Sequence, residues 1–193
     1  MKAATVEKKH SWTTKRLAVA GLMAALVVAG SAIRIKLPIA VGGTTAFHLG
    51  NIMCALSGIL LGPWLGGAAA GIGSAIFDLF DPSYAAECWI TFLLKGAYGL
   101  VAGAIAWSGK HRGVYWKEVL AAAAAAVTYA ILYLGKSYLV GGLLSGENAV
   151  AAWGIVISKL PATIFNAAVA IIFAPILAAA IRKTLQSSHL SLE

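Results

Sequence analysis

The chain has 193 residues, of which 60% are hydrophobic and only 11% are charged, and its mean hydropathy is +0.84. Soluble domains carry about a quarter charged residues, so the composition excludes an ordinary soluble domain and indicates a membrane protein. The net charge of +8 does not indicate a nucleic-acid partner, because the basic residues flank hydrophobic runs.

Six hydrophobic runs have about the length needed to cross the hydrocarbon core of a bilayer. The second run is short, and the last is long enough to include a surface segment or a strong tilt. The sequence therefore predicts an all-α membrane protein, a compact bundle of six transmembrane helices at residues 17–33, 47–61, 64–80, 89–107, 119–140 and 150–181. Residues 1–16 are expected to form a cytoplasmic N-terminal segment, 17–183 the membrane domain and 184–193 a cytoplasmic tail.

The distribution of Lys and Arg predicts the orientation of the bundle. Ten of these residues lie in the N-terminal segment, the connection after the fourth run and the C-terminal end, whereas only Arg34 and Lys36 lie in connections on the opposite side. Cytoplasmic loops carry the excess of positive charge. Both termini are therefore predicted to be cytoplasmic, in the plasma membrane of a prokaryote.

Three lysines fall within the hydrophobic runs, at Lys95, Lys136 and Lys159. With both termini inside, all three lie in the outer half of the bilayer. A charged side chain at a helix centre costs about 2.5–3.5 kcal/mol on insertion scales, so three on one side indicate a shared, wet, outward-facing site. As alternatives, Lys136 or Lys95 snorkels to the interface, or Lys95 pairs with an acidic residue, Asp78 or Glu87.

Other polar residues gather towards the same side. Asp78 lies at the outer end of the third run, His48 and Asn51 open the second, Tyr133 precedes Lys136, and Asn166 lies deeper in the sixth. As the alternative, His48 and Asn51 simply cap the second helix. The opposite halves are rich in Ala and Gly, whose spacing of four residues lets helix backbones approach closely or offers a smooth surface to a second membrane protein.

No catalytic set, metal site or cofactor is expected. GxxxxGK[ST], HExxH and GxSxG motifs are absent from the sequence, so ATP hydrolysis would have to come from partner subunits. Asp78 and Asp81 are three residues apart, but two carboxylates alone make a weak metal site.

Four segments carry a resemblance to a known family: Phe47–Asn51, Leu60–Pro63, Gly71–Leu79 and Phe92–Gly96 followed by Gly103. Their order and spacing resemble the S components of energy-coupling factor (ECF) vitamin transporters, from about Lys15 to Trp107. The resemblance implies a subunit without enzymatic activity that binds a water-soluble vitamin at its outer face. It also implies delivery of that vitamin to a transmembrane T component and two ATPase subunits.

The resemblance also implies roles for particular residues. Ala20 and Ala24 match a pair that docks on the T component, with Gly21 and Ala25 on the adjoining line, and residues 34–46 match a lid loop that includes Arg34, Lys36, Thr44 and Thr45. The substrate-binding residues implied by the two arguments together are His48, Asn51, Asp78, Tyr84, Glu87, Lys95, Tyr133, Lys136, Lys159 and Asn166.

The identity of the vitamin is less constrained by the sequence. The segment from Asp81 to Phe92 resembles members linked to cobalamin or riboflavin, which favours a corrinoid first and leaves riboflavin and pantothenate as the next candidates. Two other functions remain open: a stand-alone small-solute facilitator, and a membrane assembly subunit that binds no ligand. Alanine-rich inner ends argue against the facilitator, because its polar stripe would have to continue through them.

Overall fold

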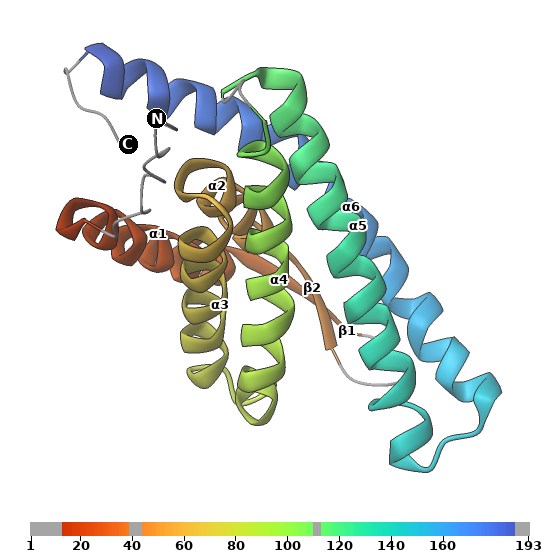
Figure 1. Cartoon of the computed structure of the whole chain (residues 1–193). Coiled ribbons are helices and arrows are strands. Elements are labelled where there is room, and N and C mark those ends of the chain that lie inside the picture. Colours follow the sequence, from red (N-terminus) through yellow and green to blue (C-terminus); the bar gives the residue numbers. More distant parts are fainter. Residues whose placement is uncertain (1–12, 39–43, 110–112, 188–193) are drawn as a thin grey trace, which may run out of the picture.

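The computed structural model describes residues 13–38, 44–109 and 113–187, and within them six α-helices, two short 3-10 helices and one β-hairpin (Figure 1). The chain order is α1 (Thr14–Ala32), β1 (Arg34–Pro38), β2 (Thr44–His48), α2 (Gly50–Leu61), α3 (Pro63–Leu79), η1 (Ala85–Glu87), α4 (Cys88–Ala106), α5 (Tyr115–Leu139), η2 (Leu143–Ser145) and α6 (Ala149–Ser187).

The helices fall close to the predicted runs, and the predominantly helical membrane fold is confirmed. Within the described residues, four segments are long and apolar enough to cross a membrane, at Thr14–Ala32, Ala85–Ala106, Tyr115–Ser145 and Ala149–Ser187. The sixth helix continues through two prolines, Pro161 and Pro175, to a length of 39 residues. Helices α3 and α4 lie side by side, as do α5 and α6 (Figure 1).

Helix α2 lies at the centre of the fold. It contacts α1, α3, α4 and α6, and all but one of its 12 residues are buried. At 1.5 Å per residue it is about 18 Å long, which is shorter than the hydrocarbon core of about 30 Å. The predicted start of the second span at Phe47 is wrong, because Phe47 and His48 belong to β2.

Close backbone contacts join α2, α3 and α4 through glycines. A Cβ on Gly66 would lie 2.5 Å from the Cα of Gly58, and one on Gly99 would lie 2.8 Å from the carbonyl oxygen of Gly66. The hydroxyl of Ser57 donates to the Gly66 carbonyl over 2.9 Å. The small residues predicted for internal packing therefore let these three helices meet at van der Waals distance.

The described part of the expected lid loop is a β-hairpin, so the prediction of an all-α fold is wrong for this segment. Strands β1 and β2 pair antiparallel, with Arg34 opposite His48 and Leu37 opposite Thr45. Polar and apolar residues alternate from Arg34 to Leu37, and this period of two is the signal for a strand. Residues 39–43 of the expected lid lie outside the described part of the chain.

Asn166 of α6 holds strand β2 in place. Its Nδ2 donates to the carbonyl of Ala46 over 2.9 Å, and its Oδ1 accepts from the backbone N–H of His48 over 3.0 Å. The amide thus pairs with the backbone of β2 as a neighbouring strand would, and it fixes the hairpin against the last helix.

At the opposite end of the bundle, side-chain N–H donors bind the carbonyls that end α2. Arg16 donates to the Leu61 carbonyl over 2.8 Å, and the Trp107 indole donates to that of Ile59 over 2.9 Å. Arg182 forms an ion pair with Glu118, which is 1% exposed. Because the last carbonyls of a helix lack partners within it, these donors stabilise the C-terminal end of α2.

Candidate ligand-binding cavity

A cavity of about 110 Å³ lies between the β-hairpin and helices α3 to α6. Nine of the ten predicted substrate-binding residues line it: His48, Asp78, Tyr84, Glu87, Lys95, Tyr133, Lys136, Lys159 and Asn166. From the expected lid, Arg34 and Thr45 also line it. The three lysines within the helices therefore share one chamber.

The lysines differ in their partners within this chamber. Lys136 forms an ion pair with Glu87. Lys95 is 6% exposed and donates to Oδ1 of Asn51, so the structure does not show the alternative in which Lys95 pairs with Asp78 or Glu87. Lys159 is 7% exposed and donates to the hydroxyl of Ser137 over 3.2 Å. Burial of Lys95 and Lys159 excludes snorkelling for both.

Two tyrosines of α5 form an aromatic wall of the cavity. The rings of Tyr129 and Tyr133 are stacked, with centroids 5.5 Å apart and an interplanar angle of 9°. The ammonium of Lys95 lies 4.1 Å from the centroid of Tyr129, and that of Lys159 lies 5.5 Å from the centroid of Tyr133. Both distances are within the range of cation–π attraction.

Sequence reasoning missed Tyr129, although a signal was present. Residues four apart on a helix share a face, so Tyr129 and Tyr133 lie one above the other, and Lys136 is three residues further on. Lys159 and Thr163 of α6 are likewise four residues apart, and Thr163 also lines the cavity. Ser74 and Thr91 are further lining residues whose types carry no comparable signal.

Asn51 is the one predicted substrate-binding residue that does not line the cavity, so its direct contact with a ligand stays a prediction. It is 2% exposed, and its Oδ1 accepts a hydrogen bond from Lys95, which does line the cavity. His48 does line the cavity, and its Nδ1 accepts from the N–H of Gly50 over 3.1 Å at the start of α2. The capping alternative therefore holds for His48, together with its place on the cavity surface.

His48 lies in strand β2, outside the helices, and is uncharged near neutral pH. Burial, with the positive charges of Lys95 and Arg34, lowers the pKa of His48 well below its ordinary value. Its neutral imidazole can accept the Gly50 hydrogen bond at Nδ1, whereas an imidazolium could not.

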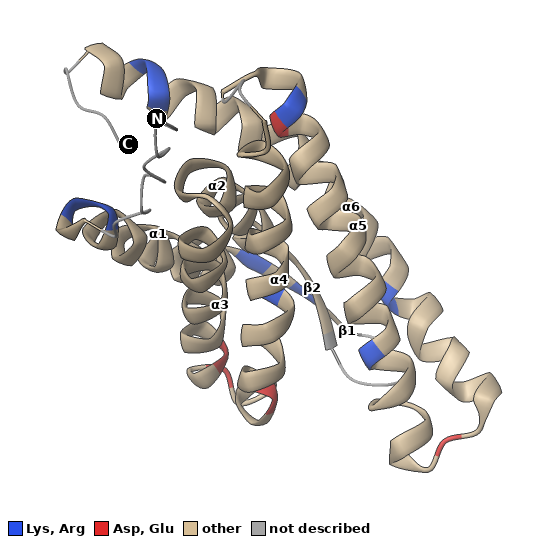
Figure 2. Ribbon diagram, viewed as in Figure 1, with Lys and Arg blue, Asp and Glu red and all other residues tan. Residues whose placement is uncertain are grey.

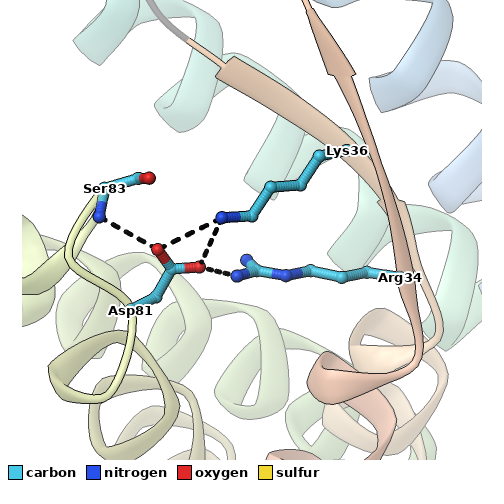
Figure 3. Close-up of polar contacts among 4 residues, drawn as sticks. All are labelled: Arg34, Lys36, Asp81 and Ser83. Carbon is cyan, nitrogen blue, oxygen red and sulfur yellow. Dashed lines mark hydrogen bonds and ion pairs between the residues drawn. The ribbon is translucent and has the colours of Figure 1, made fainter.

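Asp81, which follows α3, joins the hairpin to the rest of the protein (Figure 3). Its carboxylate forms ion pairs with Arg34 and with Lys36, whose Nζ lies 3.1 Å from Oδ2, and it accepts from the N–H of Ser83 over 2.9 Å. Asp81 is 5% exposed. Lys36, expected in the lid, does not line the cavity but holds strand β1 to Asp81. The side chain of Thr44 lies outside the described part of the structure.

Arg34 links this ion-pair group to the cavity. Its guanidinium lies 4.6 Å from the ring centroid of Phe77 and 5.5 Å from that of Tyr84, and all three side chains line the chamber. The hairpin thus contributes a cation to the chamber through the same residue that ties it to Asp81.

The expected docking residues on α1 divide into two lines. Ala20 and Ala24 are half-buried and pack against the core, because α3 approaches this side closely: a Cβ on Gly73 would lie 2.8 Å from that of Val27. Gly21 and Ala25 are exposed, and a Cβ on Gly21 would meet nothing within 4 Å. The free small-residue line of α1 is therefore the one through Gly21 and Ala25.

A helical membrane bundle with a polar chamber of buried lysines and stacked tyrosines defines a membrane-embedded protein that holds a small polar molecule. The chain matches the family of the ECF-type riboflavin transporter, S component, over residues 11–183, and it belongs to this family. An archaeal relative from Pyrococcus woesei, described as an uncharacterized protein in the gap 3′ region, is 30% identical over 119 residues. The match covers 61% of this chain and 74% of the relative.

Membership of this family confirms three predictions at a coarse level. The chain is an S component, it is a transport subunit and not an enzyme, and it is a multi-pass protein of the plasma membrane. The preference for a corrinoid gains no support. The family description names riboflavin, which the sequence placed among the next candidates.

Proposed function

We propose that this S component binds riboflavin in the cavity at the extracellular side and delivers it to an ECF T component and two ATPase subunits for import. The stacked Tyr129 and Tyr133, with an ammonium over each ring, carry the proposal. A flat heteroaromatic ring with carbonyl groups needs aromatic faces and hydrogen-bond donors together, and this chamber offers both. The family match supports the same ligand.

The proposed orientation has six membrane crossings with both termini in the cytoplasm. Basic segments occupy the N-terminal end of α1, the start of α5 and the C-terminal part of α6, whereas acidic segments mark the α3–α4 and α5–α6 connections (Figure 2). The excess of Lys and Arg on one side supports a cytoplasmic location for that side. The cavity then opens towards the exterior, since it lies near the acidic connections.

The size of the cavity supports a role for the hairpin as a lid. Pockets for drug-sized ligands measure about 300–1,000 Å³, and the chamber of about 110 Å³ is smaller. Riboflavin would enter only if the hairpin moved, and Arg34, Lys36, Thr44 and Thr45 would move with it. A corrinoid is several times larger than riboflavin and would require a larger displacement.

The proposed contacts follow from the lining of the cavity. Asp78, Tyr84, Glu87 and Lys136 lie on its surface together with the lysine–tyrosine wall, and Thr45, His48 and Asn166 belong to or hold strand β2. Asn51 acts through Lys95. For the T component, the exposed line of Gly21 and Ala25 on α1 is the proposed docking surface, with Ala20 and Ala24 at its edge.

Titration of the purified protein tests the ligand. Binding should quench the fluorescence of riboflavin. Riboflavin should also raise the thermal unfolding temperature of the protein, whereas cobalamin and pantothenate should leave that temperature unchanged. A rise with cobalamin or pantothenate but not with riboflavin would contradict the proposed cargo.

Uptake measurements test the delivery step. Radiolabelled riboflavin should accumulate in cells only when the T component and ATPase subunits are co-expressed. Uptake by the chain alone would favour the stand-alone facilitator instead. A protein that assembles with the T component but binds no vitamin would favour the assembly subunit.

A further inference from the structure

The four cationic side chains that line the cavity fall into two kinds. Arg34 is paired with Asp81, and Lys136 is paired with Glu87. For Lys95 and Lys159, no carboxylate of the described chain lies within ion-pairing distance. Two of the four cations therefore form ion pairs within the described chain, and two do not.

The two lysines without an ion pair, Lys95 and Lys159, have matching surroundings. Each donates one hydrogen bond to a buried neutral acceptor on another helix: Lys95 of α4 to Asn51 of α2, and Lys159 of α6 to Ser137 of α5. These acceptors are 2% and 1% exposed. Each ammonium also lies over one ring of the stacked tyrosine pair. The same arrangement thus occurs twice along one wall of the chamber.

The chemistry of a lysine leaves donor capacity at both positions. An ammonium carries three N–H donors, and each of these lysines uses one in a hydrogen bond to its neutral acceptor. A buried charge without an opposite charge lowers the stability of a protein. Such a cost within a membrane protein is typical of a residue kept for function.

We propose that Lys95 and Lys159 are the specificity-determining donors of the cavity, and that Asn51 and Ser137 are positioning residues that hold the two ammonium groups against the tyrosine wall. The ligand class is a flat heteroaromatic ring system that presents hydrogen-bond acceptors at two separate points. This inference rests on the proposed function, because riboflavin has acceptors on both its ring and its hydroxylated chain. Lys136 and Arg34 also line the cavity, but each is already paired with a carboxylate of the protein.

The first experiment compares affinity with stability in Lys95→Met and Lys159→Met. Each should weaken riboflavin binding roughly 10-fold or more, because a hydrogen bond from a charged donor is lost. Each should also leave the unfolding temperature of the ligand-free protein unchanged or higher, because an unpaired buried charge is removed. Lys183→Met, an exposed residue near the end of α6, is the matched control for loss of a lysine and should keep wild-type affinity.

The second experiment tests the positioning residues by double-mutant cycles. Asn51→Leu should weaken riboflavin binding in the wild-type background and have little further effect in Lys95→Met. Ser137→Ala should behave in the same way with Lys159→Met. The crossed combinations, Asn51→Leu with Lys159→Met and Ser137→Ala with Lys95→Met, should be closer to additive, since those residues share no contact.

The outcomes separate this inference from the proposed function. If the wild-type protein binds no riboflavin, the proposed function and this inference both fail. If the wild-type binds riboflavin and both methionine variants bind it with wild-type affinity, the proposed function stands and the inference is overturned. Parallel loss of stability and affinity in those variants would also overturn it, because the lysines would then be structural. Where a methionine variant does not fold, Lys95→Gln or Lys159→Gln replaces it with the same expected loss of affinity.

Discussion

Arg34 in strand β1 and Asp81 after helix α3 form an ion pair across 47 positions of the chain, and Lys36 joins the same carboxylate. Asp81 is nearly buried, whereas Lys36 remains half-exposed. The pair connects the hairpin to the connection between α3 and α4 (Figure 3), and Arg34 itself lines the chamber.

Asp81→Asn should loosen the hairpin. Removing one partner of a buried ion pair costs about 3–5 kcal/mol, and partial exposure of Lys36 places the expected loss at or below the lower end. We expect a lower unfolding temperature and faster dissociation of riboflavin, measured by stopped-flow fluorescence. Glu147→Gln, in the exposed α5–α6 connection, is the matched control. A dissociation rate equal to that of the wild type would show that Asp81 does not hold the lid.

Asn166→Leu should release strand β2 from α6. The variant loses both hydrogen bonds to the β2 backbone, and a buried backbone group left without a partner costs about 1–3 kcal/mol. We expect lower thermal stability and weaker riboflavin binding. Asn166→Asp keeps the acceptor for the His48 N–H but loses the donor to Ala46. Its thermal stability should therefore lie between that of the wild type and that of Asn166→Leu. An Asp variant less stable than the Leu variant would contradict this assignment, unless the added charge is shown to be responsible by recovery at low pH.

Gly66→Ala should destabilise the contact between α2 and α3. The new methyl group would meet the backbone of Ser57 and Gly58, which cannot move aside as a flexible side chain can. Overpacking of this kind typically costs about 1–3 kcal/mol, visible as a fall in unfolding temperature. Gly135→Ala in α5, where a Cβ meets nothing within 4 Å, should be neutral or stabilising. Equal stability of the two variants would contradict the close approach.

Gly21→Trp and Ala25→Trp should abolish riboflavin uptake in cells that contain the T component and ATPase subunits, while riboflavin binding by the purified variants remains. Both positions face outward from α1, so a large side chain there blocks a partner without disturbing the core. Ala20→Trp and Ala24→Trp should lower stability as well as uptake, because these positions are half-buried against the core. Full uptake by Gly21→Trp and Ala25→Trp would remove this line from the docking surface.

Cysteine accessibility should establish the orientation. In a background with Cys54 and Cys88 replaced by serine, a membrane-impermeant maleimide should label Thr44→Cys in intact cells and Gly113→Cys only after the membrane is opened. Thr44 begins strand β2 near the proposed outer face, and Gly113 precedes α5 beside Arg182. The reverse labelling pattern would invert the proposed topology.

The sequence alone determined the membrane class, the approximate positions of the helices and part of the cavity lining, although it missed Tyr129, Ser74 and Thr91. Hydrophobic length fixes where a chain can cross a bilayer, and the cost of burying Lys95 and Lys159 marks them without knowledge of their neighbours. The family followed from short motifs whose order is preserved along the chain, and the match over residues 11–183 confirms it.

Only the tertiary structure decided which charges are paired, and how the hairpin is held. Ion pairs such as Arg34–Asp81 and Lys136–Glu87 join residues 47 and 49 positions apart, and hydrophobic periodicity does not specify such partners. Likewise, Ala20 and Gly21 are neighbours of nearly equal size, and their different exposure depends on where α3 packs. Side-chain pairing and the packed face of a helix are properties of several elements at once, so they become definite only when the elements are assembled.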